Sequence, residues 1–255
     1  MTVTRMLYKY RTLSGPYGLQ NAADIILNDR MRWQSPTAFN DPFDCAPRFD
    51  TSVSDAAFRS WMKDALKRAG KGTPRADRRS AIAKKTRSKT EAIKNLETSF
   101  IEKLGESSVT CFSLAENHPL MWAHYADSHS GVMFQFEEPT GDIDFCGLNV
   151  DYLDQRPLVD PTAFLAGSSE IKKAILTKSS DWAYEEEVRM VEYRRAPGPR
   201  SFKTTYLKSV TLGLKISAED RQSIINVVGR RRASIPVLQS ALDRTTYRIT
   251  SRPVE

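Results

Sequence analysis

The segment Val132-Met-Phe-Gln-Phe136 places Val132, Phe134 and Phe136 at every second position. Successive side chains of a β-strand point to opposite faces, so this spacing predicts a strand with one face in the apolar core. Segments with strand character occur on both sides of it, at residues 7–11, 109–113, 148–152, 187–193, 206–212 and 247–250. The sequence therefore predicts a core that is rich in β-structure.

Helical segments are interspersed among these strands. Residues 54–70 begin with Ser54, a preferred N-cap, and carry apolar residues at helical spacing before Gly70. Further helices are predicted over residues 21–28, 73–105, 119–126 and 162–177, and from Ser217 onward, where Ser217 and Asp220 resemble a capping box. The mixed order predicts an α+β class, with a mixed, largely antiparallel sheet core and a helical, basic insertion. We expect a single α+β domain over residues 1–255, with 54–105 a helical excursion.

The composition bounds the class of protein. The chain has 255 residues and three widely spaced cysteines, Cys45, Cys111 and Cys146. An odd number of distant cysteines does not indicate a disulfide framework, and a reducing compartment is the natural expectation. The first residues lack the apolar run of a signal peptide, and no stretch approaches the roughly 18 apolar residues of a membrane span. The sequence therefore predicts a cytoplasmic protein that does not enter the membrane.

Positive charge is concentrated in one stretch. Residues 63–94 contain twelve Lys or Arg and three acids, a net charge of +9, whereas the whole chain carries +7. Such a run is typical of a nucleic-acid-binding surface, and the more common explanation is a helix face that is simply solvated. For contact with DNA or RNA, the candidate residues are Arg75, Arg78, Arg79, Lys84, Lys85 and Arg87.

The clearest candidate for chemistry is the stretch Asp181-Trp-Ala-Tyr-Glu-Glu-Glu-Val-Arg189. Glu185 and Glu187 lie two residues apart at the predicted entrance of a strand, so we expect both to face the same way, beside Arg189. Two carboxylates that share a face repel each other, and such pairs occur where a cation or a developing positive charge is bound. Trp182 and Tyr184 add stacking surface. The alternative is an exposed acidic edge in which Glu187 pairs with Arg189.

All three histidines, His118, His124 and His129, lie in the stretch 111–131, which also holds Cys111. Their spacing matches no common zinc pattern, so we expect no metal. Met121, Trp122 and Tyr125 are typical packing residues of a short helix. His124 and Tyr125 at its end are candidates to line a cleft. A nucleophile pair of Cys111 and His124 stays open as an alternative.

Two further segments have weaker signals. In Tyr8-Lys-Tyr-Arg11, the two tyrosines share one strand face and Lys9 and Arg11 share the other. Arg11 could contact an anion, or the segment could be an edge strand with solvated charges. In residues 39–45, Asn40 and Asp41 are expected to hold their own backbone in an Asx-type turn and to shape the wall of a site.

Several motifs together resemble one family, the bacterial family catalogued as domain of unknown function 2971. The resemblance covers almost the whole chain, including residues 212–217, and departs in the basic helical excursion. The motifs that carry it are Tyr8-x-Tyr10, Phe39-Asn-Asp-Pro-Phe-Asp44, Cys111-Phe-Ser113, Leu120-Met-Trp-x-x-Tyr-Ala126, His129-x-Gly131 and Trp182-x-x-Glu-x-Glu-x-Arg189. That family name implies no established activity.

The order of elements also resembles the ADP-ribosyltransferase fold, in particular its DNA-modifying toxin branch. Residues 7–11, 24–31, 109–113 and 119–122, and the strand that opens with Glu187, are similar to successive elements of that fold. In this chain Lys9 and Arg11 flank Tyr10, so the usual histidine of the first strand is absent.

The second resemblance implies an enzyme of a bacterial defence or toxin type that uses NAD as co-substrate and modifies a nucleic acid or a protein. Glu187 would be the catalytic carboxylate, with Glu185 as a possible partner. Arg11 would meet the diphosphate, and Tyr125 or Tyr184 would stack on the nicotinamide. The remaining candidates for NAD binding are Tyr10, Ser113, His124 and Arg189.

Two other functions remain open from the sequence. The first is a non-catalytic module that binds or senses nucleic acid through residues 63–94. The second is a hydrolase or nuclease in which Glu185 and Glu187 hold a divalent metal, although few other carboxylates cluster in the sequence. Whether the protein is an enzyme is therefore left undecided at this point.

Overall fold

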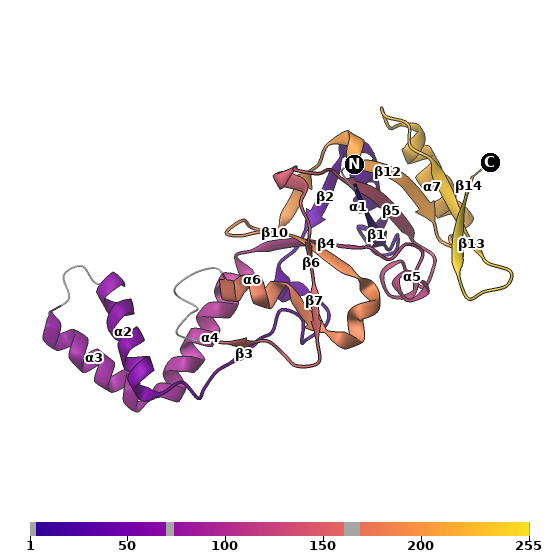
Figure 1. The fold of residues 1–255 in the computed structure, drawn as a ribbon. Coiled ribbons are helices and arrows are strands. Elements are labelled where there is room, and N and C mark those ends of the chain that lie inside the picture. Colours follow the sequence, from indigo (N-terminus) through magenta and orange to yellow (C-terminus); the bar gives the residue numbers. More distant parts are fainter. Residues whose placement is uncertain (1–3, 70–73, 161–168, 255) are drawn as a thin grey trace. The chain divides into compact units, whose positions relative to one another are not determined.

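The computed structural model describes residues 4–69, 74–160 and 169–254. The chain divides into two compact units, each described here by itself (Figure 1). We call the first, Met1–Gln34, Ser108–Val150 and Asp181–Glu255, the sheet unit, and the second, Ser35–Ser107 and Asp151–Ser180, the helical unit. Two compact units can belong to one domain, so the expectation of a single domain stays a prediction.

The sheet unit is built on a mixed eight-stranded sheet. Only one of its neighbouring pairs, β12 with β13, is parallel, and the described pairs otherwise run antiparallel. The prediction of an α+β class with a largely antiparallel sheet is therefore confirmed. The strands, in their order across the sheet, are β14 (Ile249–Pro253), β13 (Val237–Leu242), β12 (Leu207–Leu212), β5 (Val132–Glu138), β1 (Arg5–Arg11), β4 (Ser108–Ser113), β10 (Glu187–Glu192) and β6 (Leu148–Asn149).

The two faces of this sheet differ in chemistry. One face carries the main apolar core, in which Phe134 and Phe136 of β5 meet helices α1 (Gly18–Asn28) and α7 (Ala218–Gly229). We call it the α1 face. The other face carries a smaller cluster in which Tyr8 and Tyr10 pack against the short helix α5 (Pro119–Tyr125), and we call it the α5 face. The alternation along each strand therefore decides which environment a side chain enters.

Strand β1 is paired unequally on its two sides. It pairs with β5 from Arg5↔Glu138 to Arg11↔Val132, but with β4 at the single position Tyr8↔Ser113, although every residue of both strands is described. Near its start, β4 is instead bridged at Val109 by Gln34, which follows β2 (Arg30–Trp33). The same edge of β4 is thus shared by two chain segments. Strand β2 itself pairs with β11 (Gly198–Ser201).

The helical unit contains the basic stretch. Its helices are α2 (Asp55–Ala69), α3 (Arg75–Arg87), α4 (Lys89–Gly105) and α6 (Ser169–Ile175). Two small parallel sheets accompany them, β3 (Arg48–Phe49) with β8 (Leu158–Val159) and β7 (Asp151–Leu153) with β9 (Thr177–Ser179). The helix after Ser54 forms as expected, because the hydroxyl of Ser54 accepts a hydrogen bond from the backbone N–H of Ala57 at 3.1 Å.

Three predicted elements differ from the structure. The single helix predicted over residues 73–105 is broken at Ser88, where φ is −112° and ψ is 47°. The hydroxyl of Ser88 donates a hydrogen bond back to the carbonyl of Lys84. Thr73, the expected N-cap of that helix, lies outside the described residues. The strand over residues 148–152 splits at Val150 into β6, paired with β10, and β7, paired with β9. Of the helix over 162–177, residues 162–168 lie outside the described part, and the helix ends at Ile175. In the described segments, no helix combines the length and apolar character needed to cross a membrane.

Candidate functional site

A row of polar side chains crosses the α5 face. Ser209, Gln135, Tyr8, Ser113 and Glu187 occupy facing positions on five neighbouring strands. Hydrogen bonds link part of this polar row: the hydroxyl of Ser209 donates to Oε1 of Gln135 at 2.9 Å, and Nε2 of Gln135 donates to the hydroxyl of Tyr8 at 3.5 Å. Buried polar groups weaken a core unless each is satisfied. A polar row across a covered sheet face is therefore the first sign of a site.

Glu187, at the end of this row, forms a buried ion pair with Arg189. Nε and Nη2 of Arg189 donate to the two carboxylate oxygens of Glu187, each at 2.8 Å. The arginine side chain is 0% exposed and that of the glutamate 6%. The sequence left an exposed acidic edge as the alternative. The structure confirms the pairing that this alternative named, but both groups are buried rather than exposed.

The neighbouring thiol is not poised as a nucleophile. Cys111 faces Arg189 on the adjacent strand, and its thiol lies within reach of the charge of Glu187. Burial, and then the negative charge of Glu187, raise the pKa of Cys111 well above its usual value. A thiol that resists ionisation is a poor nucleophile, which argues against the pair of Cys111 and His124.

Glu185 does not lie on the strand, contrary to the expectation from its spacing. It is the last residue of the 3₁₀-helix η4 (Ser180–Glu185). The next residue, Glu186, has a left-handed backbone with φ of 43°, and strand β10 begins directly after it. Its carboxylate Oε1 accepts a hydrogen bond of 2.5 Å from the hydroxyl of Tyr125, and its carbonyl accepts one of 2.5 Å from Ser113. Burial, and then the charge of Glu185, raise the pKa of Tyr125, so its hydroxyl remains a donor.

Aromatic rings surround Glu185 and Tyr125. His118 and Tyr184 stack with an interplanar angle of 18° and centroids 5.6 Å apart. His124 lies with its centroid 6.1 Å from that of Trp182 and 6.4 Å from that of Tyr184. We call these four residues the aromatic cluster. Rings in this arrangement offer flat apolar surface to a planar ligand.

The structure brings most predicted site residues together on the α5 face. Tyr10 is among them, but its hydroxyl donates to the carbonyl of Ala115 at 2.7 Å and its ring packs edge-on against Trp122. The other members are Ser113, His124, Tyr125, Tyr184, Glu185, Glu187 and Arg189.

Arg11 is not placed with these residues. It shares the α1 face with Leu7 and Lys9, since alternate residues of β1 point the same way. The resemblance assigns Arg11, Tyr125 and Glu187 to one ligand, but Arg11 lies on the opposite sheet face from the other two.

Lys9 is buried, contrary to the alternative of a solvated charge. It is 5% exposed, and its ammonium donates to Oγ1 of Thr110 at 2.8 Å and to the carbonyl of Cys111 at 2.7 Å. Because β1 lies inside the sheet, the alternative of an edge strand with solvated charges is wrong for this residue. Burial, and then the nearby Arg11, lower the pKa of Lys9 well below its usual value. The only sequence signal was its position two residues after Leu7, in register with the apolar face.

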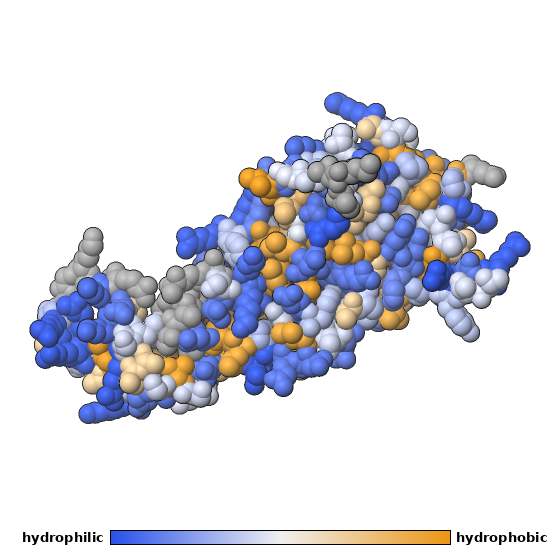
Figure 2. Space-filling view, viewed as in Figure 1, coloured by the Kyte–Doolittle hydropathy of each residue, from blue (hydrophilic) through white to orange (hydrophobic). Residues whose placement is uncertain are grey.

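The basic stretch forms α3 and its neighbours. On α3, Arg78 is half-buried, and Arg75, Arg79, Lys84, Lys85 and Arg87 are exposed. Lys84, Lys85 and Arg87 lie in the last turn, where cations favour the helix dipole. On the face shown in Figure 2, the surface over this helix is mostly hydrophilic. Part of the charge thus has a local structural explanation.

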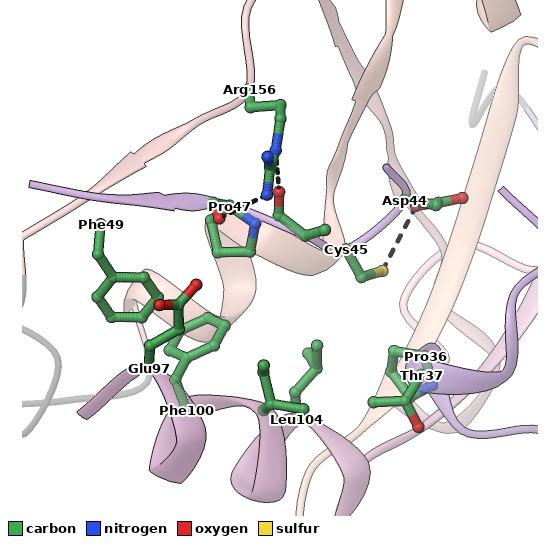
Figure 3. A pocket seen from close by; sticks show the side chains of 12 residues that line it. Pro36, Thr37, Asp44, Cys45, Pro47, Phe49, Glu97, Phe100, Leu104 and Arg156 are labelled. Atoms are coloured by element: carbon green, nitrogen blue, oxygen red, sulfur yellow. Dashed lines mark hydrogen bonds between the residues drawn. The ribbon is translucent and has the colours of Figure 1, made fainter. Parts of the chain in front are cut away.

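The helical unit contains a pocket of about 210 Å³ between α4 and the loop after η1 (Pro36–Ala38) (Figure 3). Asp44 lies at one side, where it accepts a hydrogen bond of 3.5 Å from the thiol of Cys45 and pairs with Lys178 at 3.7 Å. The expected Asx turn is confirmed for Asp41, whose carboxylate accepts from the N–H of Phe43 at 2.9 Å. This loop forms part of the pocket wall. The lining residues are Pro36, Thr37, Asp44, Cys45, Ala46, Pro47, Phe49, Glu97, Phe100, Ile101, Leu104 and Arg156.

Within the described ranges, no group of three or more His, Cys, Asp or Glu side chains is arranged to hold a metal ion. Comparison of the chain with known protein families, with curated proteins and with solved structures finds no match.

Proposed function

We propose that the chain is an ADP-ribosyltransferase-like enzyme of a bacterial defence or toxin type. It would transfer the ADP-ribosyl group of NAD to a nucleic acid or a protein. One observation carries the proposal: the buried carboxylate of Glu185 accepts a hydrogen bond from Tyr125 beside an aromatic cluster that includes Tyr184 and His124. A fixed carboxylate next to flat aromatic surface suits a reaction in which positive charge develops on a sugar.

In this reaction the bond between the ribose C1′ and the nicotinamide nitrogen breaks. Both electrons leave with the nicotinamide, which becomes neutral, and the sugar passes through an oxocarbenium-like state. A nucleophile of the acceptor then bonds to C1′ and loses its proton. We assign Glu185 to stabilise the sugar cation and to take that proton, since Tyr125 fixes its orientation.

Glu187 receives a different role from the one that the sequence predicted. Because both of its carboxylate oxygens are bound by Arg189, we assign it as a positioning residue rather than the catalytic carboxylate. The pair would hold the start of β10, and with it the turn through Glu186 that presents Glu185.

The residues on the α5 face fit a nicotinamide ring. Within the aromatic cluster, Tyr184 is half-buried and His124 is exposed, so each keeps ring surface available for stacking. The protonated hydroxyl of Tyr125 keeps a donor beside the carboxylate. The diphosphate has no assigned partner on this face, because Arg11 belongs to the other one.

The deciding experiment measures nicotinamide release from NAD with DNA, RNA and protein extract as candidate acceptors. Glu185→Gln should abolish it, Glu187→Gln should reduce it, and Glu186→Gln should leave it unchanged. Glu186 is a matched control because it is adjacent but exposed. Equal turnover by wild type and Glu185→Gln would refute the proposal, as would no turnover by the wild type with any acceptor.

A second candidate is a nucleic-acid-binding module, favoured by the basic α3. None of its six candidate cations pairs with an acid among the described residues. Binding to duplex DNA or RNA should then weaken steeply with salt. Neutralising Arg78, Arg79, Lys84 and Lys85 to Gln should abolish it. The matched control neutralises four exposed arginines of the sheet unit, Arg230, Arg232, Arg244 and Arg248, and equal losses in both variants would contradict a role for α3.

A further inference from the structure

One stripe of helix α4 lines the pocket in the helical unit. The lining residues of this stripe follow one another at positions i, i+3, i+4 and i+7, which lie on one side of a helix: Glu97, Phe100, Ile101 and Leu104. Phe100 is fully buried, and its ring packs edge-on against that of Phe49 with centroids 5.4 Å apart. The stripe is therefore apolar except at its first position, where it presents the carboxylate of Glu97 (Figure 3).

A fixed cation, Arg156, lies in the pocket wall across from α4 (Figure 3). Its Nε donates to the carbonyl of Ala46 at 2.6 Å, and its Nη2 donates to the carbonyl of Pro47 at 3.1 Å. Both carbonyls belong to residues that also line the pocket. The two bonds hold the guanidinium in one plane, so it does not have to be ordered when a ligand binds. Neutral carbonyl acceptors leave its net positive charge in place.

Neither charge at this pocket has an ionic partner. Among the described residues, Glu97 forms no ion pair and its carboxylate accepts no hydrogen bond, although the residue is half-buried. Arg156 pairs with no acid in those ranges either, so the two charges do not neutralise each other. Opposite charges that are kept apart in the wall of one pocket suit a ligand that carries both signs. A ligand with a single charge would be attracted by one group and repelled by the other.

We propose that this pocket binds a small zwitterion with an aromatic side chain, of the class of the free α-amino acids. Its ammonium pairs with Glu97, its carboxylate pairs with Arg156, and its ring enters the apolar part of the pocket beside Phe100. An apolar cavity of about 150 Å³ admits benzene, so the pocket of about 210 Å³ has room for a phenyl ring and its stem. Every lining residue belongs to the helical unit and none is assigned to the reaction above, so the site stands or falls independently of the proposed enzyme.

The test is calorimetric titration of the full chain with L-phenylalanine and with three analogues that each lack one part of it. The analogue 2-phenylethylamine lacks the carboxylate, 3-phenylpropanoate lacks the ammonium, and glycine lacks the side chain. Phenylalanine should bind, and each analogue should bind at least about tenfold more weakly, because it loses one of the three contacts. The proposal is overturned if phenylalanine does not bind. It is also overturned if 2-phenylethylamine binds as tightly as phenylalanine, which would identify a site for organic cations.

The variant Glu97→Gln tests which group holds the ammonium. It should weaken the binding of phenylalanine about tenfold or more, and it should not weaken that of 3-phenylpropanoate, which has no ammonium to lose. Glu102→Gln is the matched control, because Glu102 is an exposed acid of the same helix that does not line the pocket. It should bind phenylalanine as wild type does. Equal affinities of the two variants for phenylalanine would exclude Glu97 as the contact and overturn the proposal.

A thermal melt separates loss of the site from loss of the fold. Without ligand, Glu97→Gln should melt at the wild-type temperature, because no described residue pairs with this carboxylate. Phenylalanine at the highest concentration of the titration should raise the midpoint of wild type and of Glu102→Gln, but not that of Glu97→Gln. If Glu97→Gln is strongly destabilised without ligand, the carboxylate serves the fold rather than a ligand, and the proposal fails.

Discussion

The hydroxyl of Tyr125, on helix α5, donates a hydrogen bond of 2.5 Å to the carboxylate of Glu185, which lies 60 residues later in the chain. The contact joins the two halves of the candidate site. It orients the carboxylate that we assign to the chemistry, and it gives a buried charge one of the donors that it requires.

Removing this hydroxyl should therefore affect stability as well as activity. Tyr125→Phe leaves a buried carboxylate oxygen without its donor, which is expected to lower the free energy of unfolding by about 1.5–3 kcal/mol. Urea denaturation followed by circular dichroism measures the change. Tyr247→Phe is the control, since Tyr247 is fully exposed and should show no loss. Similar losses in both variants would mean that the contact adds nothing.

The pair of Glu187 and Arg189 should behave as a coupled unit. Arg189→Met leaves the charge of Glu187 buried and uncompensated, and we expect a loss of about 3–5 kcal/mol. Adding Glu187→Gln should restore a large part of that loss, because the double variant buries no charge. A double-mutant cycle measures the coupling energy. Strict additivity of the two single changes would show that the residues do not interact.

Lys9 should make stability depend on pH in the alkaline range. Its pKa is lowered in the folded protein, so at a pH between the folded pKa and the unfolded value near 10.4 the unfolded chain binds the extra proton. Stability then rises with pH through this window, by at most about 1.4 kcal/mol per pH unit from this one group.

The comparison with Lys9→Met isolates that contribution. The difference in unfolding free energy between wild type and Lys9→Met should shift in favour of wild type as the pH is raised from 7 to 10. Urea midpoints in a pH series measure it, and exposed Lys94 supplies the control variant Lys94→Met. If the difference does not change with pH, the ammonium is not perturbed by burial.

The N-terminus of α7 offers a local test of the sequence argument. Ser217 accepts a hydrogen bond of 2.9 Å from the N–H of Asp220, as the capping-box pattern predicted. Ser217→Ala should cost about 1 kcal/mol of unfolding free energy, and Ser217→Asp should preserve the cap. Equal melting temperatures for wild type and the alanine variant would contradict the assignment.

Local patterns were sufficient for much of the fold. The alternation of Val132, Phe134 and Phe136 is confirmed, because these three residues of β5 are fully buried on the α1 face. Ser54 and Ser217 begin helices where their hydroxyls predicted, because a cap depends on backbone groups two or three residues away. The strands that were not predicted are β2, β3, β8, β9, β11 and β13. In β11, Gly198 and Pro199 are unfavourable strand residues, and its pairing with β2 supplies what the local sequence does not.

In the candidate site, too, local sequence patterns decided some features and tertiary contacts decided others. By itself, the sequence determined that Glu187 and Arg189 share a face of one strand, because residues two apart in a strand must do so. Only the tertiary structure decided that this face of the strand is buried, which turns the pair from a solvated edge into a buried ion pair. Glu185 shows the opposite case, since a left-handed residue between it and the strand breaks the period on which the prediction rested.

The largest difference concerns β1. Its sequence determined that Lys9 and Arg11 lie opposite the two tyrosines, and this is confirmed. The sequence could not determine whether that face meets water or the core, because strand position depends on pairings with segments that lie more than a hundred residues away. The structure places β1 inside the sheet, where the ammonium of Lys9 loses water and is held instead by Thr110 and the carbonyl of Cys111.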